Sequence, residues 1–90
     1  MDKEICGFTL TVPQLRQRDV EEFQRIVHEL NPDGGFVIKR NGDIVRAAAQ
    51  MGWITDVKAE GVDDMPPYAV QALASDISDT YAAAFEVPGE

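Results

Sequence analysis

Cysteine and histidine are nearly absent from this sequence. Its 90 residues include one of each, Cys6 and His28. A single cysteine excludes an internal disulfide and a cysteine-rich metal site, and sparse use of cysteine suits a reducing compartment. One histidine beside one cysteine is too few for a zinc site, and Cys6 lies in a segment that we expect to be loose. We therefore expect no metal and no cofactor.

Long hydrophobic runs are missing as well. No stretch of the sequence approaches the roughly 20 apolar residues that cross a bilayer. The first residues, Met1-Asp2-Lys3-Glu4, are acidic where a secretory signal would carry positive charge. These absences predict a soluble, cytoplasmic protein without a membrane span.

Basic residues are scarce in the second half of the chain. Residues 47–90 hold one, Lys58, against eight acidic residues, and the whole chain has a formal net charge of −8. A nucleic-acid backbone is bound by clustered Lys and Arg, and an anionic membrane surface attracts the same residues. The charge pattern therefore argues against a nucleic-acid partner and against a membrane partner.

What the sequence does contain is typical of one small folded domain. Hydrophobic residues make up 44% and charged residues 27%, both near the norm for globular proteins. We expect a single domain over residues 1–90, with loose termini at 1–7 and 88–90. A core this small would gain stability from a homo-oligomer or a permanent partner.

Two patterns in the first third of the chain indicate a strand and a helix. Residues 8–12 alternate apolar and polar side chains and are followed by Pro13, which predicts a half-buried strand. Residues 19–30 carry apolar side chains at spacings of three and four, which predicts an amphipathic helix. Turn-forming residues follow from Asn31 and end it.

A second helix is predicted in the middle of the chain, over residues 42–51. This stretch is rich in alanine, a strong helix former. Asn41 or Asp43 would cap its start, and Gly52 would take the left-handed position after its end, with an apolar contact from Trp53. Its buried stripe would consist of Ile44, Ala48 and Met51.

The remaining segments complete the predicted fold. Residues 36–39 and 53–57 are short apolar runs that predict a second and a third strand, and residues 58–65 read as a polar connection. Pro66 and Pro67 begin the longest helix, which continues to about residue 85. The fold class predicted is α+β, with three helices packed on a small two- or three-stranded sheet and a mainly helical core. The side chains expected in that core are Leu10, Val20, Phe23, Ile26, Val27, Leu30, Ile44, Leu73, Ile77 and Tyr81.

Acidic side chains are the main candidates for chemistry. The densest group is Asp56, Glu60, Asp63 and Asp64. Its spacing matches part of a calcium-binding EF-hand loop, but Lys58 and Pro67 occupy ligand positions, so we interpret the segment as a solvated loop. Asp76 and Asp79 are interpreted as the wet face of the last helix rather than as an acid/base pair. Because no catalytic motif is found, we expect that the protein is not an enzyme.

Several motifs occur in an order that resembles a known family. They are a Phe-Thr-Leu-Thr-Val-Pro strand at 8–13, a helix start Leu-Arg-Gln-Arg-Asp-Val-Glu at 15–21, Gly-Trp-Ile at 52–54, Asp-Asp-Met-Pro-Pro at 63–67, and an alanine-rich helix followed by Val-Pro at 87–88. In this order, over residues 8–88, they resemble the tail assembly chaperones that long-tailed bacteriophages encode among their tail genes.

The resemblance implies a role in virion assembly without catalysis. Such chaperones bind the tape measure protein, keep it in solution and help to recruit tail tube subunits in the host cytoplasm. The family has no catalytic residue to transfer. We hypothesise that Trp53, Tyr68 and Phe85, large side chains at the edges of the predicted elements, contribute to a partner-binding patch. For Trp53 the alternative is that it fills the core.

Two other functions remain open from the sequence. A protein with this acidic second half could mimic DNA and occupy the basic groove of a nucleic-acid-binding protein. That hypothesis requires carboxylates spaced like phosphates over one face of the protein. The candidates are Asp56, Glu60, Asp63, Asp64, Asp76 and Asp79. A structural tail or connector subunit of the virion would have nearly the same sequence signature as a chaperone.

Overall fold

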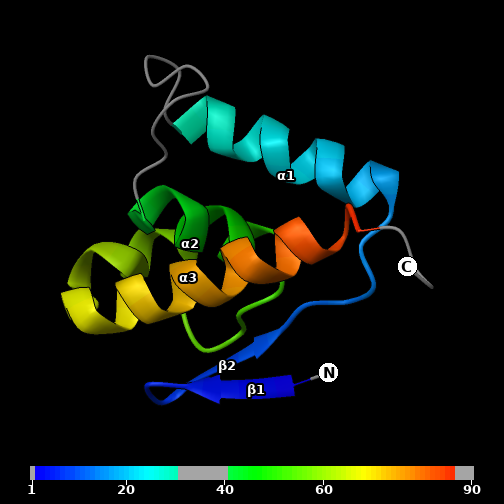
Figure 1. Ribbon diagram of the computed structural model, residues 1–90. Coiled ribbons are helices and arrows are strands. Elements are labelled where there is room, and N and C mark those ends of the chain that lie inside the picture. Colours follow the sequence, from blue (N-terminus) through cyan, green and yellow to red (C-terminus); the bar gives the residue numbers. More distant parts are fainter. Residues whose placement is uncertain (1, 31–40, 87–90) are drawn as a thin grey trace.

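Two strands and three α-helices make up most of the computed structural model, which describes residues 2–30 and 41–86 (Figure 1). The strands are β1 (Asp2–Ile5) and β2 (Phe8–Thr11), and the α-helices are α1 (Gln17–Leu30), α2 (Asn41–Gln50) and α3 (Pro67–Ala83). A short 3-10 helix, η2 (Ala59–Asp64), precedes α3. The predicted α+β class with a mainly helical core is confirmed, and the sheet in the described residues has two strands.

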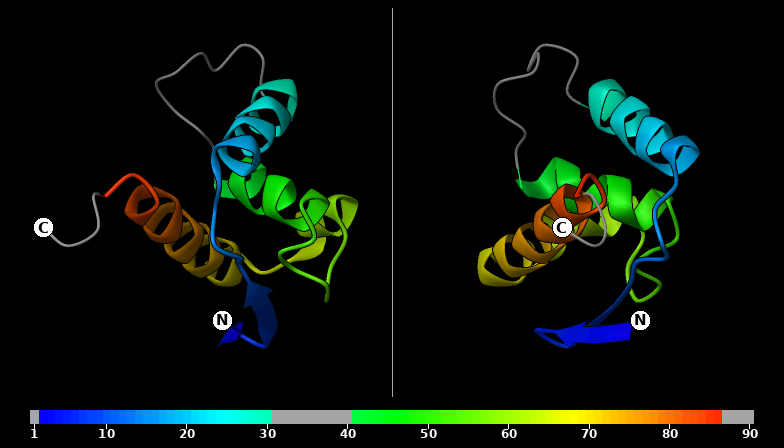
Figure 2. Two further views of the ribbon diagram at one scale, coloured as in Figure 1. Left: turned by 90° about the vertical axis from the view of Figure 1, so that its right-hand side faces the viewer. Right: turned by 45° about the vertical axis from the view of Figure 1, so that its right-hand side comes forward.

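The helix α2 occupies the centre of the arrangement. It packs against α1, against η2 and most extensively against α3. The strands lie at one end of the molecule and α1 at the other, with α2 and α3 between them (Figures 1 and 2). In the described residues, no helix has both the length and the apolar character needed to cross a membrane.

A tight hairpin joins β1 to β2. The strands are antiparallel, with Ile5 opposite Phe8, and the two turn residues Cys6 and Gly7 both have positive φ, 53° and 85°. This is the geometry of a two-residue type I′ turn, whose twist matches that of the strands.

The prediction of a loose segment at 1–7 was wrong, because residues 2–5 are paired. The physical reason is that β1 is an edge strand whose first three side chains are charged and exposed, and such a strand lacks the usual hydrophobic signal. Residues 88–90 lie outside the described residues.

The other edge of β2 meets the segment that follows α2. Leu10 forms a single β-bridge with Ile54, and the Thr11 amide donates to the Trp53 carbonyl at 2.7 Å. The next outward-facing amide, that of Thr9, donates to the carboxylate of Asp56 instead of to a backbone carbonyl. The prediction of a third strand at 53–57 was therefore wrong, because a side chain ends the pairing after one bridge. The strand predicted at 36–39 lies outside the described residues.

The helix predictions are confirmed in position, and the end of α2 is confirmed in detail. Gly52 has φ +81°, its amide donates to the Ala49 carbonyl at 3.1 Å, and the Trp53 amide donates to the Ala48 carbonyl at 3.0 Å. These two bonds define a Schellman motif, which satisfies the last carbonyls of the helix. At the start of α1, the Arg16 amide donates to the side chain of Asp19 at 3.0 Å, which anchors the first turn.

The predicted core is correct for most of its members. Seven of the ten are fully buried, while Leu30, Ile44 and Tyr81 are half-buried and pack against the core. The predicted stripe of α2 was wrong at two positions, since Ile44 and Met51 are half-buried and the buried residues are Asp43, Val45, Ala47 and Ala48. A single stripe describes a helix with one covered side, whereas α2 has neighbours on several sides.

Candidate functional site

The structure does not bring the three predicted partner-binding residues together. Trp53 is 4% exposed and stacks on Phe23, with ring centroids 5.2 Å apart and planes at 15°. Tyr68 and Phe85 are 67% and 59% exposed, and they flank opposite ends of α3. At about 1.5 Å of rise per residue, some 25 Å of helix separates them. The alternative for Trp53, core filling, is therefore confirmed, and Phe85 and Tyr68 mark two separate surfaces.

Phe85 is nevertheless connected to Trp53 through other rings. Phe23 contacts Tyr81 at 5.5 Å between centroids, and Tyr81 meets Phe85 edge to face at 5.2 Å. We call the four side chains Trp53, Phe23, Tyr81 and Phe85 the aromatic row. It runs from the buried interior to the protein surface, and its members support one another in the offset and edge-to-face geometries that aromatic rings prefer. The exposed ring of Phe85 is thus held against Tyr81, a half-buried side chain that itself packs on the core.

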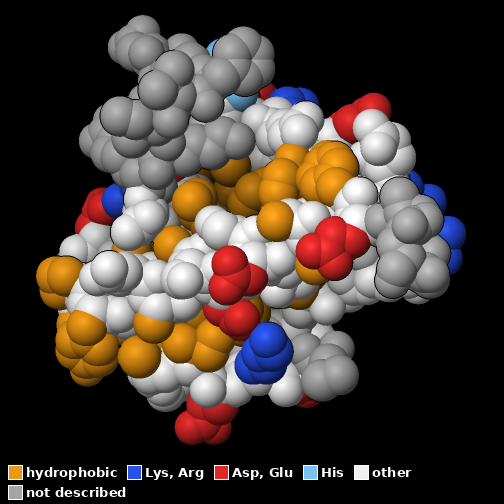
Figure 3. Space-filling model, viewed as in Figure 1, with side chains coloured by type: hydrophobic (Ala, Val, Ile, Leu, Met, Phe, Trp, Pro, Cys, Tyr) orange, Lys and Arg blue, Asp and Glu red, His pale blue; other side chains and the backbone are white. Residues whose placement is uncertain are grey.

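A small apolar groove lies beside the aromatic row. It has a volume of about 110 Å³ and opens between α1, α2 and α3. Its lining residues are Phe23, Ile44, Ile77, Ser78 and Tyr81. We call this the α1–α3 groove. Hydrophobic side chains are visible along the boundary between α1 and α3 in Figure 3. An apolar cavity of about 150 Å³ can hold benzene, so this groove is large enough for one aliphatic side chain.

One hydrogen bond joins the two helices at the edge of the α1–α3 groove. The side-chain amide of Gln24 on α1 donates to the phenolic oxygen of Tyr81 on α3, at 2.6 Å. The bond satisfies the polar end of a half-buried tyrosine whose ring is in the aromatic row. Gln24 and Ser78 are therefore polar side chains at a groove that is otherwise apolar.

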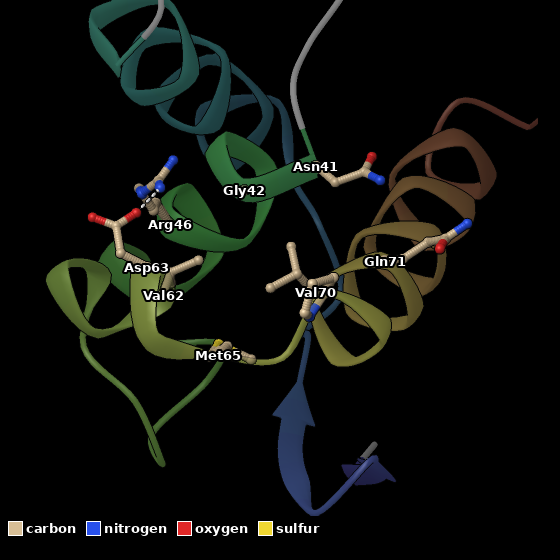
Figure 4. Close-up of a pocket in the computed structure, with 9 residues that line it drawn as sticks. Asn41, Gly42, Arg46, Val62, Asp63, Met65, Val70 and Gln71 are labelled. Carbon is tan, nitrogen blue, oxygen red and sulfur yellow. Dashed lines mark hydrogen bonds and ion pairs between the residues drawn. The ribbon is translucent and has the colours of Figure 1, made fainter.

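A second, larger pocket lies at the other end of α3, between the start of α2 and the end of η2 (Figure 4). Its volume is about 410 Å³. In Figure 4, Arg46 and Asp63 lie on one side of the pocket and Asn41 and Gln71 on the other, with Val70 between them. The pocket also includes Gly42, Val62, Met65 and Pro67. Its size suits a small ligand, but the one cation among the described residues that line it is already bound within the protein.

That cation is the guanidinium of Arg46, which binds two carboxylates. It donates to Asp43 at 2.8 Å and also to Asp63. Asp43 is 4% exposed and is the one charged residue that is fully buried among those described, whereas the side chain of Asp63 is 72% exposed. Because two carboxylates already bind Arg46, the described residues that line the second pocket offer no free positive charge to an anion.

The acidic residues singled out from the sequence do not converge on a metal site. Asp56 accepts from the Thr9 amide, Asp63 pairs with Arg46, and Asp76 pairs with Lys3 at 3.2 Å. Glu60, Asp64 and Asp79 are exposed. Within residues 2–30 and 41–86, no group of three or more His, Cys, Asp or Glu side chains is arranged to hold a metal ion. The expectation that Asp76 lies on a wet surface was wrong, because the half-buried Asp76 packs beside β1.

The clearest electrostatic effect on a titrating group is at the surface of α1. Arg25 donates to both Glu22 and Glu29, which precede and follow it by about one turn. The hydrogen bond from Arg25 lowers the pKa of Glu22, and the two carboxylates raise the pKa of Arg25. All three side chains are largely exposed, so this cluster belongs to the solvated face of α1 and indicates no reactive group.

No protein-family model matches this sequence, and no curated protein or solved structure is significantly similar to it. Function is therefore inferred from the residues of the chain itself. Sequence reasoning found Phe85 as a surface aromatic but assigned Phe23 and Tyr81 to the core alone. The signal for the aromatic row was the spacing of Tyr81 and Phe85, four residues apart and so on one side of a helix.

Proposed function

We propose that this protein is a non-enzymatic assembly chaperone of the phage tail type. In this role it binds an apolar segment of the tape measure protein and helps to recruit tail tube subunits. The observation that carries the proposal is the exposed end of the aromatic row, where Phe85 lies next to the α1–α3 groove with 59% of its surface accessible. The motifs at 8–13, 52–54 and 63–67 supply the link to phage tails.

An exposed phenylalanine held by a half-buried aromatic side chain is suited to binding a protein. Burying such a side chain contributes about 1.5–3 kcal/mol. The contact between Phe85 and Tyr81 restrains the ring before binding, so less side-chain freedom is lost when a partner covers it. Aromatic anchors beside a small pocket are typical of the residues that dominate the energy of interfaces.

The negative charge fits the same role. A chaperone that holds an apolar segment has to resist aggregation while it does so, and a net charge far from zero opposes self-association. The formal charge of −8 on 90 residues supplies that repulsion.

Co-expression tests the proposal. The candidate partner is a tape measure protein encoded in the same gene cluster, and a gene position between the tail tube and tape measure genes would be the supporting genomic observation. We expect wild-type protein to raise the yield of tape measure protein in the supernatant and to co-purify with it.

Phe85→Ala should reduce both effects. Tyr68→Ala, which removes a similarly exposed aromatic at the other end of α3, is the matched control and should reduce neither effect. Co-expression without any gain in yield would reject the proposal.

The DNA-mimic alternative has less support. Three of its six candidate carboxylates, those of Asp56, Asp63 and Asp76, are engaged by groups of the protein itself. These three carboxylates are therefore not free to take the place of phosphates. A structural tail subunit would differ from a chaperone in one measurable way, because it would remain in purified virions.

A further inference from the structure

The side of α3 next to the α1–α3 groove carries an exposed row of uncharged residues. Its members are Gln71, Ser75, Ser78, Ala82 and Phe85, and all five are exposed. They follow one another at alternating spacings of four and three, which is the spacing of the contact positions in packed helices. Phe85 continues this register beyond the last residue of α3, because its amide still donates to the Ala82 carbonyl at 3.1 Å. We call these five residues the uncharged row.

The α1–α3 groove and the uncharged row together leave a place for one more helix. Both α1 and α3 pack on α2. Ser78 of α3 belongs both to the lining of the α1–α3 groove and to the uncharged row. Its small side chain allows another backbone to approach. A helix laid there would place an aliphatic side chain in the groove and would cover the ring of Phe85. An amphipathic helix in an apolar groove is a recurring mode of peptide recognition.

Among the described residues, the charges on the α3 side of this surface have one sign. Residues 59–86 include six acidic residues and no basic one. Asp79 and Glu86 each follow a member of the uncharged row and are seven residues apart, so both lie along the same flank of α3. Neither pairs with a cation among the described residues. On the opposite side of the groove, Glu21 lies about one turn before Gln24, whose amide reaches Tyr81. Carboxylates therefore lie on both helices beside the groove, Glu21 on α1 and Asp79 and Glu86 beyond the uncharged row on α3, although none of them lines it.

We infer that the α1–α3 groove binds an amphipathic helix with aliphatic residues at heptad spacing and Lys or Arg residues on its flanks. The inference rests on the proposed function, because it specifies the kind of segment that the chaperone holds. The apolar ridge of that helix covers Phe85 and fills the groove, and its basic flanks face Asp79, Glu86 and Glu21. A second copy of this chain fits poorly, because it would bring the same acidic flanks against those residues.

A synthetic peptide tests the inference without any phage protein. The probe is a labelled peptide of about 18 residues with leucine at the heptad contact positions and lysine on the flanks, long enough to form a helix on binding. Binding is measured by fluorescence anisotropy, and its position by amide chemical shifts in NMR spectra. We expect binding that weakens steeply with added salt and shifts that concentrate at Ser78, Tyr81 and Phe85. A peptide with glutamate in place of every lysine and a scrambled peptide of the same composition should both bind at least about tenfold more weakly.

Two pairs of variants locate the effect. Phe85→Ala should weaken binding by about tenfold or more, as the loss of a central anchor does, whereas Tyr68→Ala should leave it unchanged. Replacing both Asp79 and Glu86 with Lys should weaken binding much more than replacing both Glu60 and Asp64. The two double variants change the net charge equally, and Glu60 and Asp64 are exposed in η2, an element that contributes neither to the groove nor to the uncharged row. The comparison therefore separates a local acidic flank from a general attraction to an acidic protein.

The possible results separate this inference from the proposed function. Equal losses in the two double variants, or equal binding of the scrambled peptide, would overturn the inference. A self-association in sedimentation experiments that Phe85→Ala abolishes would also overturn it, since the groove would then be an interface between copies. If the peptide binds as expected but no tape measure protein is held, the helix-binding site stands and the phage role falls. If tape measure protein is held but the peptide does not bind, the chaperone role stands and this mode of binding falls.

Discussion

Asp43 and Arg46, one turn apart on α2, join a fully buried carboxylate to a guanidinium that reaches the surface. The bond between them is 2.8 Å long, and the same guanidinium also binds the exposed carboxylate of Asp63. One arginine thus connects the centre of the helical core to η2. The two carboxylates differ in burial, and this predicts that the two halves of the cluster contribute unequally to stability.

Removing the arginine should cost more than removing its exposed partner. We expect Arg46→Met, which retains much of the aliphatic stem, to lower the free energy of unfolding by about 1–3 kcal/mol, because a buried carboxylate loses a charged donor. Asp63→Ala should change it by less than about 1 kcal/mol, as is usual for an exposed ion pair. Urea unfolding followed by circular dichroism measures both. Equal effects of the two substitutions would contradict the assignment of the larger contribution to Asp43.

Large-to-small substitutions in the core should be strongly destabilising. Phe23 is 4% exposed and contacts both Trp53 and Tyr81, and Leu73 is fully buried in α3. Phe23→Ala or Leu73→Ala should each lower the free energy of unfolding by about 2–5 kcal/mol, through lost burial and the cavity left behind. Thermal melts followed by circular dichroism provide the measurement, with Tyr68→Ala as the control at an exposed site. Melts unchanged by either core substitution would show that the core is wrongly placed.

The sequence predicted those parts of the fold that depend on local signals. The apolar stripe of α1 and the glycine that closes α2 are determined by residues close together in the chain, so their positions could be predicted. The strand β1 could not, because its stability comes from pairing with β2 while its own side chains are charged. The third strand was overestimated because its pairing is ended by Asp56, a side chain whose target amide on β2 could not be known in advance.

The candidate site was predictable only in part. Exposed aromatics flanking the two ends of α3 follow from helical spacing, so Tyr68 and Phe85 could be proposed as surface residues. The aromatic row and the α1–α3 groove depend on how α1, α2 and α3 cross, which the sequence pattern does not specify. The buried position of Asp43 was missed for the same reason. A carboxylate in the first turn of a helix is normally a surface residue near the positive end of the helix dipole.

Replacing Gly52 at the end of α2 should lower the free energy of unfolding through backbone strain alone. Gly52 has φ +81°, and a Cβ added there would meet no atom within 4 Å. Gly52→Ala should therefore lower the free energy of unfolding by about 1–2 kcal/mol through left-handed strain without any clash. Gly52→Asn should cost clearly less, because asparagine tolerates this conformation. Urea unfolding of the two variants compares them directly. An equal cost for both would indicate that strain is not the cause.

The hydrogen bond from Gln24 to Tyr81 predicts a coupling between α1 and α3. Gln24→Ala and Tyr81→Phe should each destabilise the protein, because each removes the 2.6 Å bond, and for the same reason their effects should not add. A double-mutant cycle should give a coupling energy of about 0.5–1.5 kcal/mol. Gln17→Ala provides the control, because Gln17 lies on the same helix but donates to Glu21 at 3.0 Å, so its effect should add to that of Tyr81→Phe. A coupling near zero for Gln24 and Tyr81 would mean that aromatic contacts alone hold α1 against α3.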